Sequence, residues 1–577
     1  MNLQSQLIKE IKRIFVTLGD MDSSEEEFGV KTASRPEFGD YQVDGILSIS
    51  KKKCIKPREL ALVITNELNK VNYIDIAEVA GAGFINIKIK DKYIINEINK
   101  SIHSDRLNIP TISNPETIVI DYSSPNVAKE MHVGNIRSTI IGDAVVKTFE
   151  FLGHKVIRVN HIGDWGTQFG MLIAYMENLD HNKDNLTISE LESFYRKAKQ
   201  KYDTDNNFSK KSRDYVVKLQ QGDDYCQKIW KKLVDITMRQ NQETYERLGV
   251  SLKENNIMGE SLYNSMLPII VEDLLQRGLA HKSQGAIVVY LDEYKNRSGE
   301  PMGVIVQKQD GGFLYTTTDI ACVKYRYDQF KADRILYYID SRQNLHLSQA
   351  WDIARKAKYI PDHVKLEHHM FGMMLGKDGK PFKTRTGGTV KLSELIDEAV
   401  SRARNLVLDK RKDLSENEVN SIAEIVGIGA IKYSDLSKNR VTDYIFDWDN
   451  MLSFDGNTAP YIQYAYTRIL SLINKNNGTE NLCEVTCLNY EIEKKLARQL
   501  LRLEEVLMIV AKDGTPHVLC SYLYNISVVY SKFYEECPVL SIADNETKNS
   551  RLALSILTAK TLEKGLDILG IKVPARM

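Results

Sequence analysis

Residues 117–161 alternate between strand and helix patterns with very short joints, and this alternation constrains the possible fold more than any other feature. TIVIDYS and KVIRVNHIG read as strands, and IRSTIIGDAVVKTFEFLG between them reads as a helix that stops at Gly153. The apolar stripe of this helix consists of Ile136, Ile140, Val145, Phe149 and Leu152. A strand, a helix and a second strand joined this closely build a parallel sheet, which the segments RILYYID and VKLEHHMF extend. We therefore predict an α/β chain.

The N-terminal region, to about Pro110, has a pattern of its own. An opening helix and the helix PRELALVITNELNKV precede the strand GFINIKIK, which places Phe84 and Asn86 on the face opposite three isoleucines. An exposed aromatic ring beside an amide suits an unstacked nucleobase. The alternative is that Phe84 covers a second small core.

Two further regions follow from composition and spacing. A charge-rich helical stretch from about Met171 to Met258 indicates an insertion in the sheet domain, which we extend to about residue 310. From about Thr389 the chain is almost wholly helical, with the apolar spacing of a helix bundle. We predict three domains, at residues 1–110, 111–388 and 389–577.

The bulk composition is that of a globular protein in a reducing compartment. The 577 residues carry a formal net charge of +0, so any nucleic-acid surface would be a local face. No apolar run is long enough to cross a bilayer, and the N-terminus lacks the apolar core of a signal peptide. We expect a cytoplasmic protein without a membrane partner.

The seven cysteines are odd in number and scattered, which indicates reduced thiols. Cys483 and Cys487, with His517 and Cys520, offer four zinc ligands, although neither pair has the close spacing of a zinc ribbon or finger. The alternative, which we favour, is that these are cysteines buried in helices. No metal site is predicted.

The loop SSPNVAKEMHVGNIRS lies between the first strand and helix of the sheet, where open α/β sheets bind ligands. The N-terminus of a helix favours anions. His132 and Asn135 can donate hydrogen bonds to phosphate, and Gly134 lets the backbone approach it. A His-x-Gly loop alone is also compatible with a plain turn.

A second loop, GMMLGKDGKPFKTRTGG, follows the last strand. Its glycines make it mobile, and its cations are Lys377, Lys380, Lys383 and Arg385. A cationic loop of this kind can close over a triphosphate and stabilise the leaving pyrophosphate. The alternative is a solvated basic loop that binds nothing. Both loops in one α/β domain favour a nucleotidyl-transfer enzyme.

The two loops resemble the H-I-G-H and K-M-S-K-S signatures of class I aminoacyl-tRNA synthetases. SSPNVAKEMHVGN and YIQYAYTRI are similar to the arginyl-tRNA synthetase family in particular, and the likeness runs to the final residues. Two positions depart from the signatures: Asn135 replaces the last histidine, and Thr384 stands where the catalytic lysine is expected. The resemblance implies that Lys129 compensates. It also implies a catalytic set of Lys129, His132, Gly134, Asn135, Lys380 and Lys383, and an ATP-binding set of His132, Gly134, Asn135, Met373 and Lys383.

The resemblance implies a fold and a reaction. The fold is a Rossmann-type parallel-sheet catalytic domain with a helical insertion, a small α+β N-terminal domain and an all-α anticodon-binding bundle. The reaction activates L-arginine with ATP and Mg²⁺ and transfers it to the terminal adenosine of tRNA(Arg), with activation that requires bound tRNA. We expect a monomer. The rival functions are a class I synthetase for another amino acid and a tRNA-binding relative that has lost turnover.

A guanidinium presents a planar fork of donors, so its pocket must contain carboxylates. Such a pocket rejects lysine through unpaired acceptors, by roughly 10⁴-fold or more, and needs no editing domain. Asp319 could alternatively cap the helix IACVKYRYDQF. Similarity to the family implies an arginine-binding set of Ser123, Asn126, Glu260, Tyr315, Asp319 and Gln343, with Asp164, Trp165 and Gln168 shaping the pocket floor.

The tRNA contacts are likewise implied by the resemblance. Tyr461, Tyr464 and Arg468 share one face of the helix APYIQYAYTRILSL, which suits splayed bases but is also typical of core packing. Met577 would close the anticodon pocket. The implied tRNA-binding set is Phe84, Asn86, Tyr461, Tyr464, Arg468 and Met577.

Overall fold

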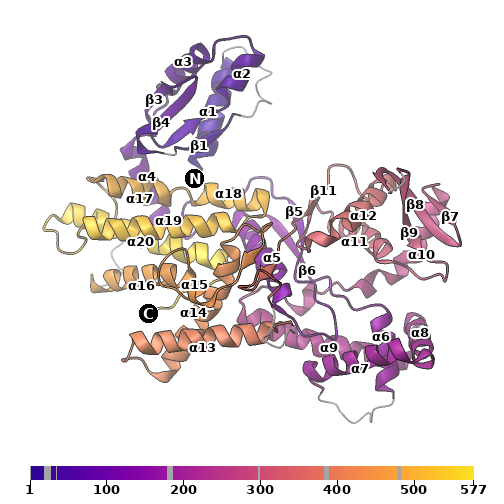
Figure 1. Cartoon of the computed structure of the whole chain (residues 1–577). Coiled ribbons are helices and arrows are strands. Elements are labelled where there is room, and N and C mark those ends of the chain that lie inside the picture. The colour runs from indigo at the N-terminus through magenta and orange to yellow at the C-terminus, as the bar shows by residue number, and fades with distance from the viewer. Residues whose placement is uncertain are drawn as a thin grey trace.

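The computed structural model describes residues 2–17, 28–33, 35–177, 186–296, 299–382, 389–476 and 483–577. Figure 1 shows a small N-terminal lobe standing on a helical body, with the central sheet beside that body and two further lobes beyond the sheet. The predicted combination of a parallel sheet, a small α+β N-terminal part and a helical C-terminal part is confirmed.

The N-terminal lobe is a four-stranded antiparallel sheet in the order β1-β2-β4-β3, packed against helices. Along β4 the three isoleucines are buried, whereas Phe84 is 37% exposed. Phe84 therefore covers no second core. The elements of this lobe are α1(Leu3–Thr17), β1(Val30–Thr32), β2(Tyr41–Val43), α2(Ile46–Lys52), α3(Pro57–Leu68), β3(Ile74–Ala80), β4(Phe84–Ile89) and the connecting α4(Asp91–Ile102).

The central sheet has four parallel strands in the order β11-β10-β5-β6. The predicted strand, helix and strand are β5(Thr117–Asp121), α5(Val133–Leu152) and β6(Lys155–Val159), and α5 ends at Gly153 with φ 97°. The remaining strands are β10(Arg334–Tyr337) and β11(Lys365–His368), joined by α12(Asn344–Lys356). Because all four strands are parallel, the loops that follow β5 and β10 meet at one edge of the sheet.

The insertion is helical only in its first half, which consists of α6(Thr167–Met176), α7(Ile188–Thr204), α8(Asn206–Gln220) and α9(Asp224–Arg247). Its second half adds α10(Leu267–Gln276) and a three-stranded antiparallel sheet that we did not predict. The strands are β7(Ala280–Ser283), β8(Ala286–Lys295) and β9(Pro301–Gln307). The sequence AIVVYLDEYK of β8 has the β-branched and aromatic residues of a strand, a signal that the preceding charged helices obscured. The helix α11(Tyr315–Phe330) then leads back to β10.

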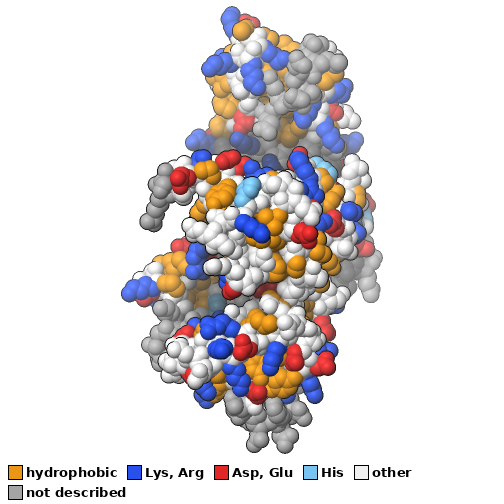
Figure 2. Space-filling view, turned by 90° about the vertical axis from the view of Figure 1, so that its right-hand side faces the viewer, with side chains coloured by type: hydrophobic (Ala, Val, Ile, Leu, Met, Phe, Trp, Pro, Cys, Tyr) orange, Lys and Arg blue, Asp and Glu red, His pale blue; other side chains and the backbone are white. Residues whose placement is uncertain are grey.

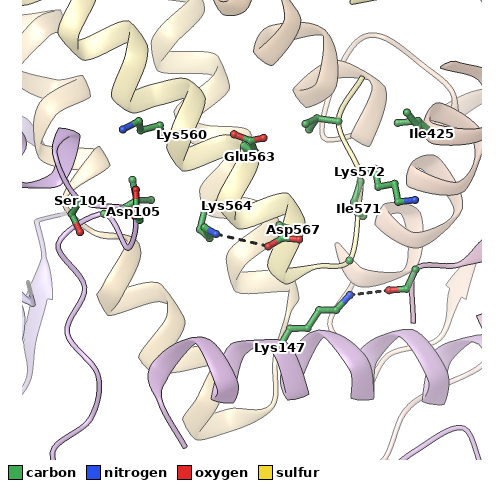
Figure 3. A pocket seen from close by; sticks show the side chains of 14 residues that line it. Ser104, Asp105, Lys147, Ile425, Lys560, Glu563, Lys564, Asp567, Ile571 and Lys572 are labelled. Atoms are coloured by element: carbon green, nitrogen blue, oxygen red, sulfur yellow. Dashed lines mark hydrogen bonds and ion pairs between the residues drawn. The ribbon is translucent and has the colours of Figure 1, made fainter. Parts of the chain in front are cut away.

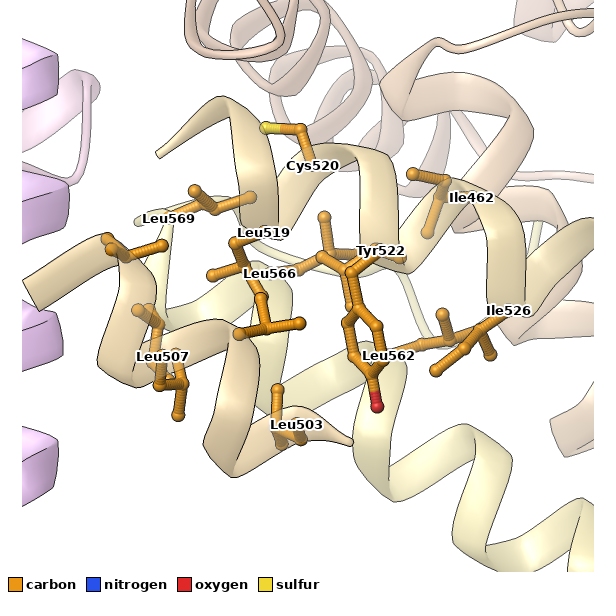
Figure 4. Close-up of a cluster of buried hydrophobic side chains, with 14 of the residues drawn as sticks. Ile462, Leu503, Leu507, Leu519, Cys520, Tyr522, Ile526, Leu562, Leu566 and Leu569 are labelled. Atoms are coloured by element: carbon orange, nitrogen blue, oxygen red, sulfur yellow. The ribbon is translucent and has the colours of Figure 1, made fainter. Parts of the chain in front are cut away.

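The C-terminal part is a helix bundle whose core is drawn in Figure 4, where Leu507, Leu519 and Leu562 from three helices meet. A short parallel pairing of β12(Met374–Leu375) with β13(Tyr444–Ile445) ties the bundle to the second loop. The helices are α13(Leu392–Lys410), α14(Glu416–Leu436), α15(Trp448–Met451), α16(Ala459–Lys475), α17(Glu491–Leu500), α18(Leu503–Asp513), α19(His517–Glu536) and α20(Asn545–Ile568).

The interpretation of the possible zinc ligands as cysteines buried in helices is correct for Cys520 but wrong for Cys483 and Cys487, which are only partly buried and lie between α16 and α17. Cys487 lies against Ser550 of α20, with 3.7 Å between its Sγ and the serine Oγ, whereas Cys520 is buried within α19. Within the described ranges, no group of three or more His, Cys, Asp or Glu side chains could hold a metal ion. None of the helices in those ranges combines the length and the apolar character needed to cross a membrane.

Candidate active site

The loop that follows β5 is strained and firmly held. Ser123, Ser124 and Ala128 all have left-handed backbones, with φ of 72°, 48° and 63°. Such conformations cost about 1–3 kcal/mol each and cluster at functional sites. The hydroxyl of Ser123 lies 2.8 Å from the hydroxyl of Tyr245 on α9, and the amide of Ala128 donates to Thr237 on the same helix. The helical insertion therefore fixes the shape of this loop.

His132 begins helix α5 and forms a closed set of hydrogen bonds with the next turn. Its Nδ1 accepts from the amide of Gly134 at 3.0 Å, and its own amide donates to Oδ1 of Asn135 at 3.0 Å. Because Nδ1 accepts, the proton of a neutral ring is on Nε2. Burial, followed by the nearby charge of Lys129, lowers the pKa of His132 and favours this neutral ring. The site can thus offer an Nε2–H donor at a helix N-terminus.

Gly134 is required for this arrangement, because a Cβ at that position would lie 2.8 Å from the imidazole of His132. Lys129 stacks over the ring of Tyr195 on α7, with Nζ 4.8 Å from the ring centroid. The cation that we expected to compensate for Thr384 is therefore beside His132.

The segment that follows the second loop pairs with the first loop. The amide of Val133 donates to the carbonyl of Val390 at 3.1 Å, and the amide of Leu392 donates to the carbonyl of Met131 at 2.9 Å. The chain that leaves the second loop thus runs alongside His132. This contact places the residues that directly follow the second loop beside the first loop, although the two segments are distant in sequence.

The second loop is anchored at its start. The amide of Met373 donates to Oδ1 of Asp443 at 2.6 Å, and Lys377 lies 3.1 Å from Oδ2 of Asp447. Lys380 is exposed on the turn that follows. Lys383, Thr384 and Arg385 lie outside the described residues.

An acidic cluster lies near the first loop, because the amide of Glu260 donates to the carbonyl of Ile162 and the neighbouring Gly163 pairs with Asn126. Burial, together with the charges of Asp164 and Asp319, raises the pKa of Glu260 to about 8, so the three carboxyl groups are close to one another. The pKa of Tyr315 is raised by burial and by the charges of Glu260 and Tyr195, although the side chain is 68% exposed. Tyr315 thus approaches Tyr195 of α7. Figure 2 shows that the surface is hollowed between the lobe of β7–β9 and the helical lobe below it.

Asp319 is not the helix cap that we considered as an alternative. Helix α11 begins at Tyr315 with Leu314 as its N-cap, so Asp319 lies one turn inside the helix. No strand leads directly into this helix, since β9 ends at Gln307 and Phe313 forms only an isolated bridge. The carboxyl group of Asp319 is therefore not used to cap this helix.

Both carboxylate oxygens of Asp164 are hydrogen-bonded within the protein, so this side chain has a structural role beside Glu260. Its Oδ1 accepts from the amide of Ser261 at 2.9 Å, and its Oδ2 accepts from the hydroxyl of Ser261 at 2.6 Å. A Cβ on Gly259 would lie 2.3 Å from this carboxylate, so glycine is needed for the close approach. These contacts fix the segment that carries Glu260.

The remaining arginine-binding candidates occupy different environments. The hydroxyl of Ser123 is buried and also accepts from Thr139. Asn126 and Gln343 are exposed on the loops after the adjacent strands β5 and β10. Sequence reasoning missed His346, whose Nε2 lies 2.5 Å from Oδ2 of Asp319. The only available signal was its position three residues after Gln343.

Family comparisons agree with this geometry along the whole chain. The model of the class I tRNA synthetase (R) catalytic domain matches residues 97–448, that of the arginyl tRNA synthetase N-terminal domain matches 1–89, and that of the DALR anticodon-binding domain matches 462–577. The chain belongs to the arginyl-tRNA synthetase family. A curated arginine–tRNA ligase of Klebsiella pneumoniae subsp. pneumoniae is 57% identical over 580 residues, and that of Cronobacter sakazakii is 56% identical over 579, with both chains covered fully in each case.

Solved structures of arginyl-tRNA synthetases have the same fold. The structure from Plasmodium falciparum superposes with a TM-score of 0.84 at 30% identity, covering 100% of this chain and 98% of that one. The structure from Thermus thermophilus superposes with a TM-score of 0.82 at 22% identity, with complete coverage of both chains. This synthetase fold thus includes the unpredicted antiparallel sheet within an otherwise expected architecture.

The helix α16, within the region matched by the anticodon-binding model, has one partly exposed aromatic face. Tyr464 is 46% exposed, whereas Tyr461 packs against Tyr524 with ring centroids 5.7 Å apart. Arg468 lies over the ring of Tyr534, 4.2 Å from its centroid. Met577 packs against the core, and its carbonyl accepts from Arg411. On the N-terminal lobe, the Asn86 side chain accepts from Gln42 at 2.8 Å.

A cavity of about 550 Å³ lies elsewhere in the synthetase, between α5, α20 and the segment that follows α4 (Figure 3). Lysines and acids of α20 line it together, including Lys560, Glu563, Lys564 and Asp567. None of the predicted site residues lines this cavity.

Proposed function

We propose that this chain attaches L-arginine to tRNA(Arg) at the expense of ATP, and that the residues named below carry out the reaction. The observation that carries the proposal is the acidic pocket of Glu260 and Asp319 beside the loop of His132. A cationic substrate side chain is what two neighbouring carboxylates select. Tyr195 contacts Lys129 of the nucleotide loop and approaches Tyr315 of the pocket, so the two substrates would bind next to each other.

In the first step, Asp319 and Glu260 bind the guanidinium, and Asn126 and Gln343 bind the ammonium and carboxylate ends. An oxygen of the arginine carboxylate attacks the α-phosphorus of ATP, the bond to the β-phosphate oxygen breaks, and pyrophosphate leaves. His132 donates its Nε2–H to a phosphate oxygen at the N-terminus of α5. Lys129, Lys380 and Lys383 balance the charge that develops on pyrophosphate.

In the second step, the terminal adenosine ribose attacks the arginyl carbonyl and AMP leaves. The Tyr461, Tyr464 and Arg468 face would bind anticodon bases together with Met577, and Phe84 with Asn86 would contact the tRNA on the N-terminal lobe. We further propose that arginine activation requires bound tRNA, and that the enzyme is a cytoplasmic monomer. The bases would stack on the exposed aromatic rings.

Mg²⁺ is expected to enter with the triphosphate, whose oxygens commonly carry it in such reactions. The described residues contain no cluster of three or more carboxylate, imidazole or thiolate ligands that would hold it. No step is therefore derived through the metal.

Charging of purified tRNA(Arg) with labelled arginine tests the proposal, with Asp319→Ala as the matched control. We expect wild-type charging to proceed and the variant to lose it, because the pocket loses a carboxylate. Pyrophosphate exchange with each amino acid, with and without tRNA, would expose a synthetase of another specificity or an activation step independent of tRNA. Binding of tRNA without any charging would identify a non-catalytic relative instead.

A further inference from the structure

His346 is the one titratable side chain that hydrogen-bonds to Asp319 in the described part of the pocket. It lies on the first turn of α12, and its Nε2 donates to Oδ2 of Asp319 on α11 across 2.5 Å. A carboxylate can only accept, so Nε2 must carry a proton. The side chain of Asp319 is 19% exposed, which makes this contact partly shielded from water.

The contact leaves Asp319 with one oxygen for a ligand. Other ionised acids in this protein are satisfied differently: Glu367 receives Nε and Nη2 of Arg334 on its two oxygens, at 2.7 and 3.0 Å. Against the effect of burial, hydrogen bonds from His369 and from Arg334 lower the pKa of Glu367 to about 2, and together they leave its oxygens little capacity for a further cation. At Asp319, in contrast, a single imidazole nitrogen occupies one oxygen.

The orientation of Asp319 therefore depends on His346. A carboxylate on a helix can rotate about its last torsion, and a single short hydrogen bond to Oδ2 restricts that rotation. Oδ1 is then free to face the pocket, together with the carboxyl group of Glu260, whose pKa responds to the charge of Asp319. Two acceptors from two separate carboxyl groups suit the planar fork of a guanidinium better than the single point charge of an ammonium.

We propose that His346 is a positioning residue of the arginine pocket, which holds Asp319 so that its second oxygen meets the substrate guanidinium. This inference rests on the proposed function, in which Asp319 binds arginine. His346 acts through Asp319 and does not touch the reacting atoms. The direction of its pKa agrees with this role, because the hydrogen bond to Asp319 raises the pKa of His346 despite its partial burial.

In a purely structural role, His346 would instead only hold α11 against α12. The two roles predict different kinetics. If the role is only structural, substitution of His346 would change the KM values for arginine, ATP and tRNA together, or would lower only the thermal midpoint of unfolding. A positioning residue changes the KM for arginine alone and weakens discrimination against lysine.

The test measures pyrophosphate exchange in the presence of tRNA for His346→Phe and His346→Gln. Because a hydrogen bond to a charged group is lost, His346→Phe should raise the KM for arginine about tenfold to a hundredfold, while the KM for ATP stays within about twofold. His346→Gln restores an N–H donor and should recover most of the loss. Should the phenylalanine variant fold poorly, His346→Ala with added imidazole provides the same comparison, and recovery by imidazole is expected.

A double-mutant cycle with Asp319→Asn separates this inference from the proposed function. If His346 acts through Asp319, the double variant should have nearly the same arginine KM as Asp319→Asn alone. Fully additive effects, or an unchanged arginine KM in His346→Phe, would overturn the positioning role. An unchanged arginine KM in Asp319→Asn would instead overturn the proposed arginine site, whatever His346 does.

Discussion

Glu260 should make arginine binding depend on pH. Burial in the first place, and then the charges of Asp164 and Asp319, raise the pKa of its carboxyl group to about 8. In the empty pocket the carboxyl group is therefore mostly protonated at pH 7. A bound guanidinium favours the ionised form, because opposite charges at short range stabilise each other. Arginine binding should thus release a proton from Glu260.

The size of the effect follows from the pKa. With a pKa of about 8, roughly one tenth of Glu260 is ionised at pH 7 and about half at pH 8. Apparent affinity falls with the fraction of protein that is competent to bind, so the Kd for arginine should decrease about fivefold from pH 7 to pH 8. Binding at pH 7 should release about 0.9 proton from this group. The sign is set by the raised pKa, since the competent form accumulates only as pH rises.

Calorimetric titration of arginine without ATP measures the released protons, when carried out at pH 7 in two buffers of different ionisation enthalpy. Bound tRNA is included in every titration, so that arginine can bind whether or not its binding requires tRNA. Glu260→Gln is the matched control, and the difference between the two proteins isolates this carboxyl group from His346. Arginine heats that are independent of the buffer in both proteins would refute the reasoning.

The same pKa predicts a stability effect of opposite sign. Because the native state holds the Glu260 proton more tightly than the unfolded chain does, stability is lost as pH rises from the ordinary glutamate range toward 8. The uncharged glutamine has no such penalty. Glu260→Gln should therefore have a higher Tm than the wild type at pH 8.5 without arginine, and an equal or lower Tm would contradict the pKa assignment.

Three further substitutions test other parts of the site. Asp443→Ala removes the carboxylate that holds the Met373 amide at 2.6 Å, so the KM for ATP should rise about tenfold while the KM for tRNA is unchanged, as steady-state charging would measure. Tyr464→Ala should raise the KM for tRNA about tenfold, with no change in Tm, because an exposed stacking ring is lost. Arg326→Met leaves the buried Asp121 without its partner at 2.6 Å and should lower the unfolding free energy by about 3–5 kcal/mol in urea titrations, whereas a loss below about 1 kcal/mol would contradict that assignment.

Local patterns in the sequence were enough to predict the scaffold. The stripe on α5 and the alternation in β4 depend on residues within a few positions of each other, and both are observed. The joining of the two signature loops could be inferred from topology, since parallel strands present their following loops at one edge. The three domain boundaries and the roles of the site residues stay predictions.

What could not be predicted depends on packing between elements. Asp319 and His346 are 27 residues apart and meet only because α11 and α12 pack side by side. No periodicity marks such a contact. The position of Asp319 inside α11, and not at the cap that we considered as an alternative, depends on the helix beginning at Tyr315, five residues before the helix start that such a cap would imply. Propensity alone does not place a helix boundary that exactly.

The departure at Asn135 from the class I signature has a physical explanation in the capping geometry. The Oδ1 atom of Asn135 accepts a hydrogen bond from the amide of His132, and Nδ1 of His132 accepts one from the amide of Gly134. The two side chains together cap the first turn of α5. An amide oxygen performs this task without charge. The positive charge that a histidine could add here is available nearby from Lys129, whose proximity already lowers the pKa of His132. A second cation at position 135 would depress that pKa further, and the neutral Nε2–H donor would be no stronger for it. The positive charge of the proposed nucleotide site therefore comes from Lys129 and the second loop. Asn135 can then act as a capping residue of helix α5.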